Sequence, residues 1–298
     1  MLTFLKCPDG QSVPVKDCLL GGCRMGSRCL TLPTLTLIAK ERVWSGTPST
    51  TQLLNGTMQE FLKLTKPYTI DPQDRLFALL GTYHHQRLED VAKALGLPSE
   101  IPLTEEDKDI FDLLEPENSS WVLTDYKTWG SYRVAKALGV VATGKQPNSL
   151  GEVYKTSGAW GKAGSPKMVT VFQRDSEKAD LTESELQLNR YRVLLSKRGV
   201  PVSRMQLQIT VRDGGLAAAQ SRGVTQRGYV VAIRSLPDDI VQQYFATKAS
   251  NLKAALEKGN WGTPCTPAEC WDGNKCQGYC EVAEFCSYKN NEAKKEAI

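Results

Sequence analysis

Nine cysteines lie only near the two ends of the chain, and this distribution limits the fold more than any other feature of the sequence. A secreted disulfide protein usually spreads its bridges through the core, and the early polar residues of MLTFLKCPDG do not form an export signal. The odd number of cysteines favours reduced thiolates that bind metal. We therefore expect a cytoplasmic protein with Cys-rich metal-binding segments at both termini. The two groups are Cys7, Cys18, Cys23 and Cys29, and Cys265, Cys270, Cys276, Cys280 and Cys286.

The rest of the composition is that of a globular protein. Of the 298 residues, 41% are hydrophobic, which is enough to bury a sizeable core. No apolar run approaches the roughly 20 residues that a membrane-spanning helix needs, so we expect no membrane partner. The net charge of +4 permits an anionic partner but does not require one.

Helix and strand patterns in the long middle of the chain predict an α/β fold. Apolar residues at helical spacing, with capping residues, predict helices, and short alternating or β-branched runs predict strands. The order of these elements favours a mixed central sheet flanked by helices. The predicted helices cover residues 48–64, 72–96, 182–199 and 237–259, and the predicted strands cover residues 109–115, 120–128, 168–173, 205–213 and 228–236.

Composition divides the chain into three parts. Residues 1–47 form an N-terminal Cys-rich segment, residues 48–260 form the α/β core, and residues 261–298 form a C-terminal Cys-cluster segment with a solvated tail. Within the core, residues at about 130–166 are rich in Gly, Ser and Lys. This composition predicts a loop or a locally folded insertion.

The strand predicted over residues 120–128 delivers Asp125 and Lys127 to the same side, because side chains alternate along a strand. Asp112 stands in the preceding predicted strand and would meet Asp125 at one edge of the sheet if the two strands pair as a hairpin. Two neighbouring carboxylates repel each other, and a hard divalent cation such as Mg²⁺ or Mn²⁺ relieves the repulsion. The alternative is a plain surface ion pair between Asp125 and Lys127.

Two predicted helices carry polar residues one turn apart. The stretch GTYHHQRLE places Gly81, His85 and Glu89 at intervals of four residues. The stretch ESELQLNRYRVLL places Gln187 and Tyr191 on one helical face. Taken alone, each pattern also fits ordinary helix packing.

Taken in order, however, G-x-x-x-H, Asp112, D-x-K and Q-x-x-x-Y resemble the motifs of the RecB-like nucleases of the PD-(D/E)xK superfamily. The resemblance covers roughly residues 48–290. It is closest to the branch that carries cysteine clusters, which includes the CRISPR-associated RecB-like exonucleases. The resemblance implies a restriction-endonuclease-like core with one active site built from these four motifs.

The resemblance also implies a role for each matching residue. His85, Asp112 and Asp125 would bind the catalytic Mg²⁺ or Mn²⁺, and the carbonyl of Tyr126 would complete the shell of that ion. Lys127 would be the catalytic lysine. The residues that would line the site, contacting DNA or orienting the lysine, are Gln187 and Tyr191.

Two further acidic residues belong to these expectations. Glu89, one turn beyond His85, is a supporting candidate only. Asp109 stands three residues before Asp112, at a position where many relatives have Gly. Asp109 is therefore the carboxylate that competes with Asp112 for the metal.

The C-terminal cysteines also match the family. Cys276, Cys280 and Cys286 resemble the C-terminal triplet of its iron–sulfur members, in which a fourth cysteine lies upstream of the His helix. The matching upstream helix has no cysteine here, so Cys270, Cys265 or one of the N-terminal group would be the fourth ligand. We expect an iron–sulfur cluster of the 4Fe-4S type or Zn²⁺, because both are thiolate sites.

The N-terminal group could form a separate site. Cys7, Cys18, Cys23 and Cys29 could bind one zinc ion, although the C-x2-C spacing typical of such sites is absent. The alternative is that these residues are reduced thiols without metal. A metal at either end would be structural, because these short segments bury too little apolar surface to fold alone.

We expect a metal-dependent DNA nuclease, an exonuclease that hydrolyses phosphodiester bonds with metal-activated water. By resemblance its substrate would be DNA with a single-stranded end, and its partners would be recombination or repair proteins in a bacterial or phage setting. One alternative is a non-catalytic nucleic-acid-binding or assembly module with the same fold. Another is a thiol-based redox protein, which would leave the acidic and basic residues unexplained.

The insertion offers a further contact with DNA. Its basic and aromatic side chains could follow a strand by charge and stacking. The alternative is a solvated loop. The residues concerned are Lys145, Lys155, Trp160, Lys162 and Lys167.

Overall fold

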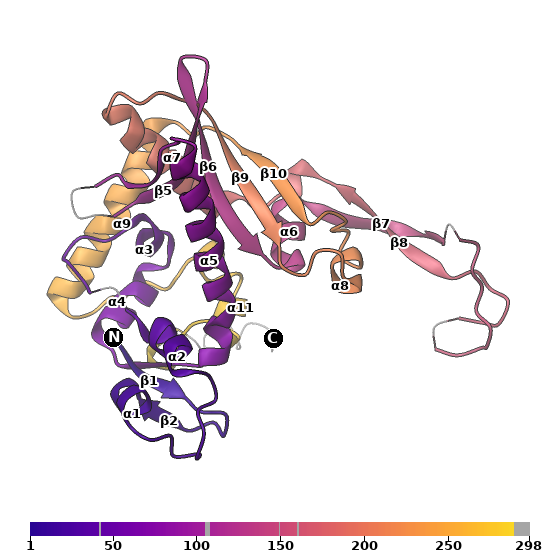
Figure 1. Ribbon diagram of the computed structural model, residues 1–298, viewed down its shortest axis with the longest axis horizontal. Coiled ribbons are helices and arrows are strands. Elements are labelled where there is room, and N and C mark those ends of the chain that lie inside the picture. The colour runs from indigo at the N-terminus through magenta and orange to yellow at the C-terminus, as the bar shows by residue number, and fades with distance from the viewer. Residues whose placement is uncertain (42, 105–107, 149, 160, 289–298) are drawn as a thin grey trace.

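Within the residues that the computed structural model describes, a five-stranded mixed sheet forms the centre of the protein (Figure 1). β6 and β9 are parallel, and the other neighbouring strands are antiparallel. The mixed α/β class predicted from the sequence is therefore confirmed. The strands lie in the order β10 (Gly228–Ile233), β9 (Val202–Val211), β6 (Ser120–Trp129), β5 (Ile110–Glu117) and β4 (Ser99–Pro102).

The structure describes most of the chain. Among the helices described, none is long and apolar enough to cross a membrane. Two parts of the sequence predictions, Trp160 and the tail after residue 288, lie outside the described residues. The described ranges are 1–41, 43–104, 108–148, 150–159 and 161–288.

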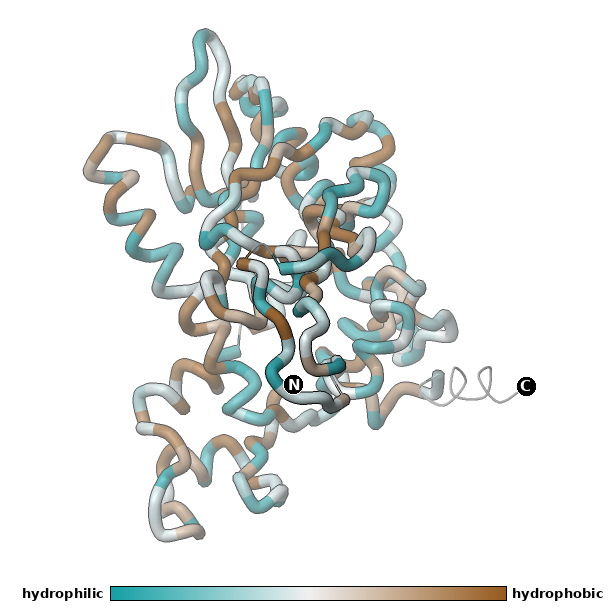
Figure 2. Tube along the Cα trace, turned by 90° about the vertical axis from the view of Figure 1, so that its right-hand side faces the viewer, coloured by the Kyte–Doolittle hydropathy of each residue, from teal (hydrophilic) through white to brown (hydrophobic). Residues whose placement is uncertain are grey.

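β5 and β6 form an antiparallel hairpin, which was the condition for Asp112 and Asp125 to meet. Their register pairs Leu113 with Thr124 and Glu117 with Ser120. The turn between them contains Asn118, whose φ of 54° is in the left-handed region that asparagine tolerates. The changes between hydrophobic and hydrophilic residues along the chain can be followed in Figure 2.

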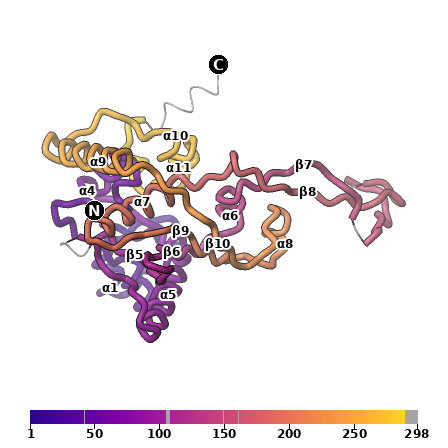
Figure 3. Tube along the Cα trace, turned by 90° about the horizontal axis from the view of Figure 1, so that it is seen from above, coloured from indigo at the N-terminus to yellow at the C-terminus, as the bar shows by residue number. Residues whose placement is uncertain are grey.

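Helices cover both faces of the sheet. α7 (Thr182–Lys197) packs on one face, where Leu123 of β6 and Leu188 of α7 belong to the main core. α5 (Pro72–Ala94) packs on the other face, beside Tyr126 of β6. Figure 3 shows α5 and α9 on opposite sides of the strands. α7 also provides the long crossover that the parallel pair β6 and β9 requires.

The remaining helices are mostly short. α9, the longest of them, packs against α3, α4 and α7, and its position agrees with the helix predicted over residues 237–259. They are α1 (Val15–Leu20), α2 (Leu32–Ala39), α3 (Thr50–Leu54), α4 (Thr57–Thr65), α6 (Ser131–Ala137), α8 (Ala217–Gln220), α9 (Asp238–Lys258), α10 (Pro267–Cys270) and α11 (Asn274–Gly278), with 3₁₀ turns at Ser176–Lys178 and Ala283–Phe285.

The helix predicted over residues 48–64 is wrong as a single helix, because it is divided into α3 and α4. Ser49 caps α3 with a capping box, as its sequence suggested. Asn55 then adopts an extended conformation and ends α3. A side chain on Gly56 would begin 2.2 Å from the Sγ atom of Cys265. Glycine is therefore required at the point where the C-terminal segment approaches.

Both terminal segments pack onto the body of the protein. β1 (Leu2–Lys6) pairs with β2 (Ser12–Pro14) and, in parallel, with β3 (Tyr68–Ile70). The division at residue 47 is therefore not a break in the packing. Buried residues from the N-terminal segment, α4, α9 and the C-terminal segment share one hydrophobic cluster, which includes Leu5, Leu35, Phe61, Leu252 and Val282.

The insertion forms an extended arm. β7 (Val140–Pro147) and β8 (Met168–Arg174) make a separate two-stranded sheet that projects from the body (Figures 1 and 3). The predicted strand at 168–173 is confirmed, but it does not join the central sheet. α6, inside the predicted insertion, packs against the body through Val134. The insertion is therefore better described as an arm over residues 140–174.

Candidate active site and metal sites

Three acidic residues lie in one row across three neighbouring strands. β4 pairs Ser99 and Ile101 with Leu113 and Phe111, so Glu100 stands beside Asp112 on the neighbouring strand. The paired stretch of β5 and β6 begins at Leu113 and Thr124, the residues that adjoin Asp112 and Asp125. The backbone N–H of Tyr126 donates to Asp112 Oδ2 at 2.6 Å. Asp112 is 8% exposed and Asp125 is 2% exposed. β5 and β6 are interior strands, so the two aspartates lie within the sheet and not at its edge, where the sequence analysis placed them.

His85 on α5 lies over this row. Its Nε2 atom is 2.9 Å from the carbonyl oxygen of Tyr126. A carbonyl only accepts hydrogen bonds, so Nε2 carries the hydrogen and Nδ1 faces the carboxylates. Nδ1 lies 3.5 Å from Asp112 Oδ2 and 3.6 Å from Glu100 Oε1. The Tyr126 carbonyl, expected in the metal shell, thus orients the imidazole here, as second partners of metal-binding histidines commonly do.

The group formed by His85, Glu100 and Asp112 has the donor atoms of a divalent-metal site. One ligand atom from each residue lies within 4.8 Å of the other two. Burial and the nearby charge of Asp125 raise the pKa of Asp112 to about 7. Burial alone would lower the pKa of His85, but Glu100, Asp112 and Asp125 outweigh it and raise that pKa. The excess negative charge and the oxygen-rich donor set fit Mg²⁺ or Mn²⁺.

Asp125 belongs to a second network, on the α7 side. Gln187 Nε2 donates to Asp125 Oδ1 at 3.2 Å and to the Tyr191 hydroxyl at 3.4 Å. Lys127 Nζ donates to Gln187 Oε1 at 3.3 Å. The predicted motifs D-x-K and Q-x-x-x-Y therefore contact each other directly. Burial raises the pKa of Tyr191, so its hydroxyl stays protonated.

Lys127 and Asp125 form an ion pair inside this network. Nζ lies 2.6 Å from Asp125 Oδ2, although this buried oxygen accepts no hydrogen bond from the described residues. Burial alone would lower the pKa of Lys127, but the Asp125 charge outweighs it and raises the pKa. The lysine is therefore an ammonium ion, and Asp125 Oδ2 retains acceptor capacity for a cation.

Asp109, the carboxylate expected to compete with Asp112, is held by other groups. Its Oδ1 atom accepts a hydrogen bond from the Thr50 backbone at 2.6 Å, and its Oδ2 atom lies 3.0 Å from Arg190. Both carboxylate oxygens are therefore engaged away from His85. The φ of Asp109 is 56°, a conformation that favours glycine.

The other two residues of the predicted helix motif, Glu89 and Gly81, have different positions relative to the site. Glu89 forms an ion pair with Lys93 one turn further along α5, so it does not reach the site. A side chain on Gly81 would begin 3.2 Å from Thr128 Oγ1, which explains a small residue where α5 approaches β6.

Glu100 is the site residue that the sequence analysis missed. It comes from the short strand β4, which was not predicted, and it stands in no motif. Its position is set by the pairing of β4 with β5, which depends on tertiary structure. Asp125 was the third ligand predicted from the sequence. Its charge raises the pKa of His85 and of Asp112, and its side chain contacts Lys127 and Gln187 directly.

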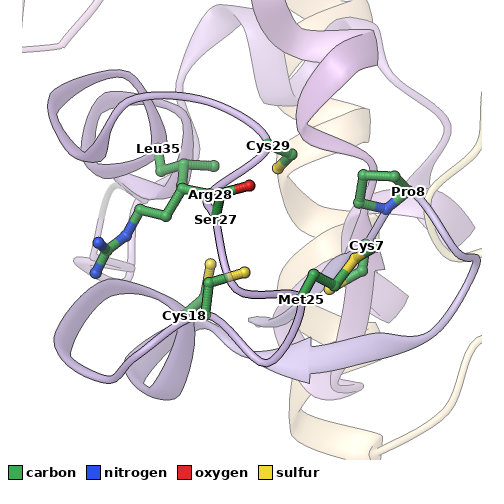
Figure 4. A pocket seen from close by; sticks show the side chains of 9 residues that line it. Cys7, Pro8, Cys18, Met25, Ser27, Arg28, Cys29 and Leu35 are labelled. Carbon is green, nitrogen blue, oxygen red and sulfur yellow. The ribbon is translucent and has the colours of Figure 1, made fainter.

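The four N-terminal cysteines line one cavity (Figure 4). All four are free thiols. Burial raises the pKa of Cys18, and the nearby thiols of Cys29, Cys7 and Cys23 raise it further. The structure therefore brings together the group that the sequence analysis proposed as a separate metal site.

Three of the C-terminal cysteines lie near one another. Burial raises the pKa of Cys265, as do Cys286 and Cys280 nearby, and all three pack against one hydrophobic cluster. Cys270 is buried, and its thiol contacts the carbonyl of Pro267. Cys265, which the resemblance left open as a fourth ligand, thus lies near Cys280 and Cys286.

Comparison with known proteins gives no family for this chain. No family model matches it, and no curated protein matches it. One similar solved structure is a crystal structure of SSO0001, with 14% sequence identity over 86% of this chain and 93% of that chain. Its TM-score of 0.42 carries no argument about the present site, which stands on its own geometry.

Proposed function

We propose that the protein is a divalent-metal-dependent DNA nuclease with a restriction-endonuclease-like core of the PD-(D/E)xK type. The observation that carries this proposal is the row of Glu100, Asp112 and Asp125, with His85 over one end and Lys127 at the other. Such a concentration of partly buried carboxylates calls for a cation. The strand order and the crossover through α7 support the same proposal.

The residues that would hold the ion are His85, Asp112 and Glu100, with Asp125 Oδ2 beside them. When bound, a Mg²⁺ or Mn²⁺ ion supplies Lewis acidity toward a phosphoryl oxygen and lowers the pKa of water. The chain's own part is to hold the imidazole through the Tyr126 carbonyl and to place its Nδ1 atom beside Glu100 and Asp112.

Lys127 supplies the fixed positive charge. Its ammonium group is held by Asp125 and Gln187, so it stays in place without substrate. A preorganised cation stabilises the negative charge that develops on a phosphate during attack. Gln187 connects Asp125, Lys127 and Tyr191 and sets their relative positions.

The C-terminal cysteines would hold an iron–sulfur cluster or zinc, which would tie the C-terminal segment to the body. Cys265, Cys280 and Cys286 lie close enough to affect one another, and Cys276 or Cys270 would complete the set. Thiolate sulfur and an apolar surround fit such a group. In this position the cluster or the zinc ion would stabilise the fold and would take no part in the reaction.

The test is a time course on end-labelled DNA with a single-stranded tail, with Mn²⁺, with Mg²⁺ and with chelator. We expect metal-dependent cleavage that falls by about 10²- to 10³-fold in Lys127→Ala, in line with the loss of one transition-state charge contact. Lys253→Ala, an exposed lysine on α9, is the matched control and should keep full activity. Wild-type protein that binds this DNA but never cuts it would refute the nuclease and favour the non-catalytic binding module.

A further inference from the structure

The N-terminal cysteine cavity differs in size from a zinc site. It is lined by Cys7, Cys18, Cys23 and Cys29, and its volume is about 180 Å³. Four thiolates on one tetrahedral zinc ion, at about 2.3 Å each, lie about 3.8 Å from one another. Among the described residues, however, no three cysteine sulfurs lie within 4.8 Å of one another. In a cubane cluster each thiolate binds a different iron atom, so its thiolates stand farther apart.

The segment that carries two of these cysteines has little packing of its own. Cys23 and Cys29 lie on residues 21–31, which contain no helix or strand and no buried side chain. A loop with so little packing does not hold two thiols toward one cavity by its own contacts. Ligation to a metal centre would fix it, as in other small segments without a core.

The surroundings of the cavity suit an anionic thiolate cluster. Arg28 lines the cavity, so a guanidinium group lies among the residues around the four thiols. Arg24 interacts with the thiol of Cys7 and pairs with Asp9. The other lining residues include the apolar side chains of Leu35, which is buried, and Met25, which is exposed.

From these observations we infer that Cys7, Cys18, Cys23 and Cys29 together bind one iron–sulfur cluster of the 4Fe-4S type. This site is separate from the C-terminal one, because all four ligands come from residues 7–29. The cluster orders residues 21–31 and locks β1 and α1 against the body.

The test uses the full-length protein, purified without oxygen, with iron, sulfide and zinc measured per chain. We expect the double variant Cys18→Ser, Cys23→Ser to lose about four iron atoms relative to wild type. Ser27→Ala lines the same cavity without a thiol and should keep them. Unchanged iron in the double variant, or the loss of zinc in place of iron, would overturn the inference.

A second variant covers the case in which the double variant does not fold. Cys29 is exposed, and Cys29→Ser replaces a sulfur ligand with oxygen. We expect the electron paramagnetic resonance signal of the reduced protein to change for one cluster. An identical spectrum in wild type and Cys29→Ser would also overturn the inference.

A second and independent observation concerns charge. The arm, residues 140–174, contains five basic residues and one acidic residue, so its net charge is +4. The chain has 37 basic and 33 acidic residues, so the remaining 32 of each sign cancel. The whole net charge of the protein is therefore located on the arm.

The arm also has the shape of a binding element. Both faces of β7 and most of β8 are open to solvent, and an isolated two-stranded ribbon is only marginally stable in water. Among the described residues, Lys167 pairs with Glu152, whereas Lys145, Lys155 and Lys162 make no ion pair. A ribbon of this width fits the major groove of a DNA duplex, where its lysines neutralise phosphates.

The geometry points to the arm as the part of the protein that grips the DNA duplex beyond the cleaved end. This inference rests on the proposed function only for the identity of the nucleic acid. The arm begins 11 residues after Trp129, the last residue of the strand that carries Lys127. Duplex held by the arm would therefore lead toward the row of carboxylates.

Binding of a fluorescent duplex with a single-stranded tail, measured in chelator over a range of salt concentrations, tests the arm. The triple variant Lys145→Gln, Lys155→Gln, Lys162→Gln should bind more weakly and lower the slope of log K against log salt by up to about 2.7, which is 0.9 for each lost phosphate contact. The matched control is Lys66→Gln, Lys253→Gln, Lys258→Gln, three exposed lysines of the body.

The outcomes separate the two proposals. If both triple variants have the same salt slope and the same affinity for DNA, the inference that the arm binds the duplex is wrong, whatever the cleavage assay shows. If the arm variant binds DNA more weakly and the wild type never cuts it, the inference about the arm stands and the proposed nuclease activity is refuted.

Discussion

Glu100 and Asp109 are both non-glycine residues with a left-handed backbone, with φ of 50° and 56°. Such conformations cost about 1–3 kcal/mol each and persist where the surroundings impose them. At Asp109 the surroundings are Arg190 and the Thr50 backbone, which hold both carboxylate oxygens. At Glu100 the conformation brings the carboxylate beside His85. The strain thus lies at the entry to β5 and on β4, next to the proposed metal ligands.

The protonation of these ligands gives the first prediction. Protons compete with a cation for Asp112, whose pKa is about 7, and for His85, whose pKa is raised. Both groups release their protons as pH rises, so a fixed concentration of Mn²⁺ should raise the melting temperature more at pH 8 than at pH 6. Scanning fluorimetry measures the shift. Asp112→Asn should remove most of the difference, and an equal shift at both pH values would contradict the proposed site.

Without a cation, the contribution of Asp112 to stability should change with pH in the opposite direction. A carboxyl whose folded pKa is raised contributes stability that is present below its unfolded pKa of about 3.9 and is lost as pH rises through about 7. Asp112→Asn should therefore gain stability relative to wild type over this interval in metal-free buffer. Equilibrium unfolding at pH 4 and pH 8 compares the two proteins.

Gln187 gives the second prediction, because one amide contacts Asp125, Lys127 and Tyr191. Gln187→Ala should lower the rate of DNA cleavage by about 10- to 100-fold while the protein stays folded. Gln206→Ala, which removes an amide bonded to Thr124 on the same sheet, is the matched control. A Gln187 variant as active as this control would show that the amide serves only packing.

At the scale of elements, the root of the arm gives the third prediction. Gly223 has a φ of +71°, and a side chain there would begin 2.6 Å from Phe172 and 2.7 Å from Val140. Gly223→Ala should therefore separate the arm from the body at a cost of about 1–3 kcal/mol. Hydrogen exchange should become faster in β7 and β8 and stay unchanged in β6. Gly262→Ala, with open space around it, is the control.

Elements with a clear local sequence pattern were predicted from the sequence. α7 and β6 have clear periods and capping or turn residues, and both lie within a few residues of their predicted limits. β5 and β6 were predicted as strands, and they pair as the hairpin that the sequence analysis had considered. These elements carry Asp112, Asp125, Lys127 and Gln187, which is why most of the candidate site was visible in the sequence.

Features set by tertiary contacts were not predicted. The break between α3 and α4 depends on the approach of Cys265 to Gly56. The pairing of β8 with β7 outside the central sheet depends on the return of the chain through the arm. Glu100 enters the site through the register of β4, a strand of four residues with no periodic signal. No local pattern contains this information.

At the scale of the whole molecule, the shared hydrophobic cluster gives the fourth prediction. Leu35 of α2 is fully buried in the cluster that joins both terminal segments to α4 and α9. Leu35→Ala should lower the free energy of unfolding by about 2–5 kcal/mol and shift one common transition in calorimetry. Leu37→Ala, 49% exposed on the same helix, should have little effect. A separate early transition would show that the terminal segments unfold as an independent unit.

The crossover through α7 has a consequence for biosynthesis. The side chains of the proposed active site come from α5, β4, β5, β6 and α7, so the set is incomplete until the chain has been made through Tyr191. β6 also gains its neighbour β9 only after residue 211 has emerged. If the protein is a nuclease, a nascent or prematurely terminated chain would have an incomplete active site and could not cleave DNA. The genome of the producing cell would then meet nuclease activity only from chains that extend beyond these residues.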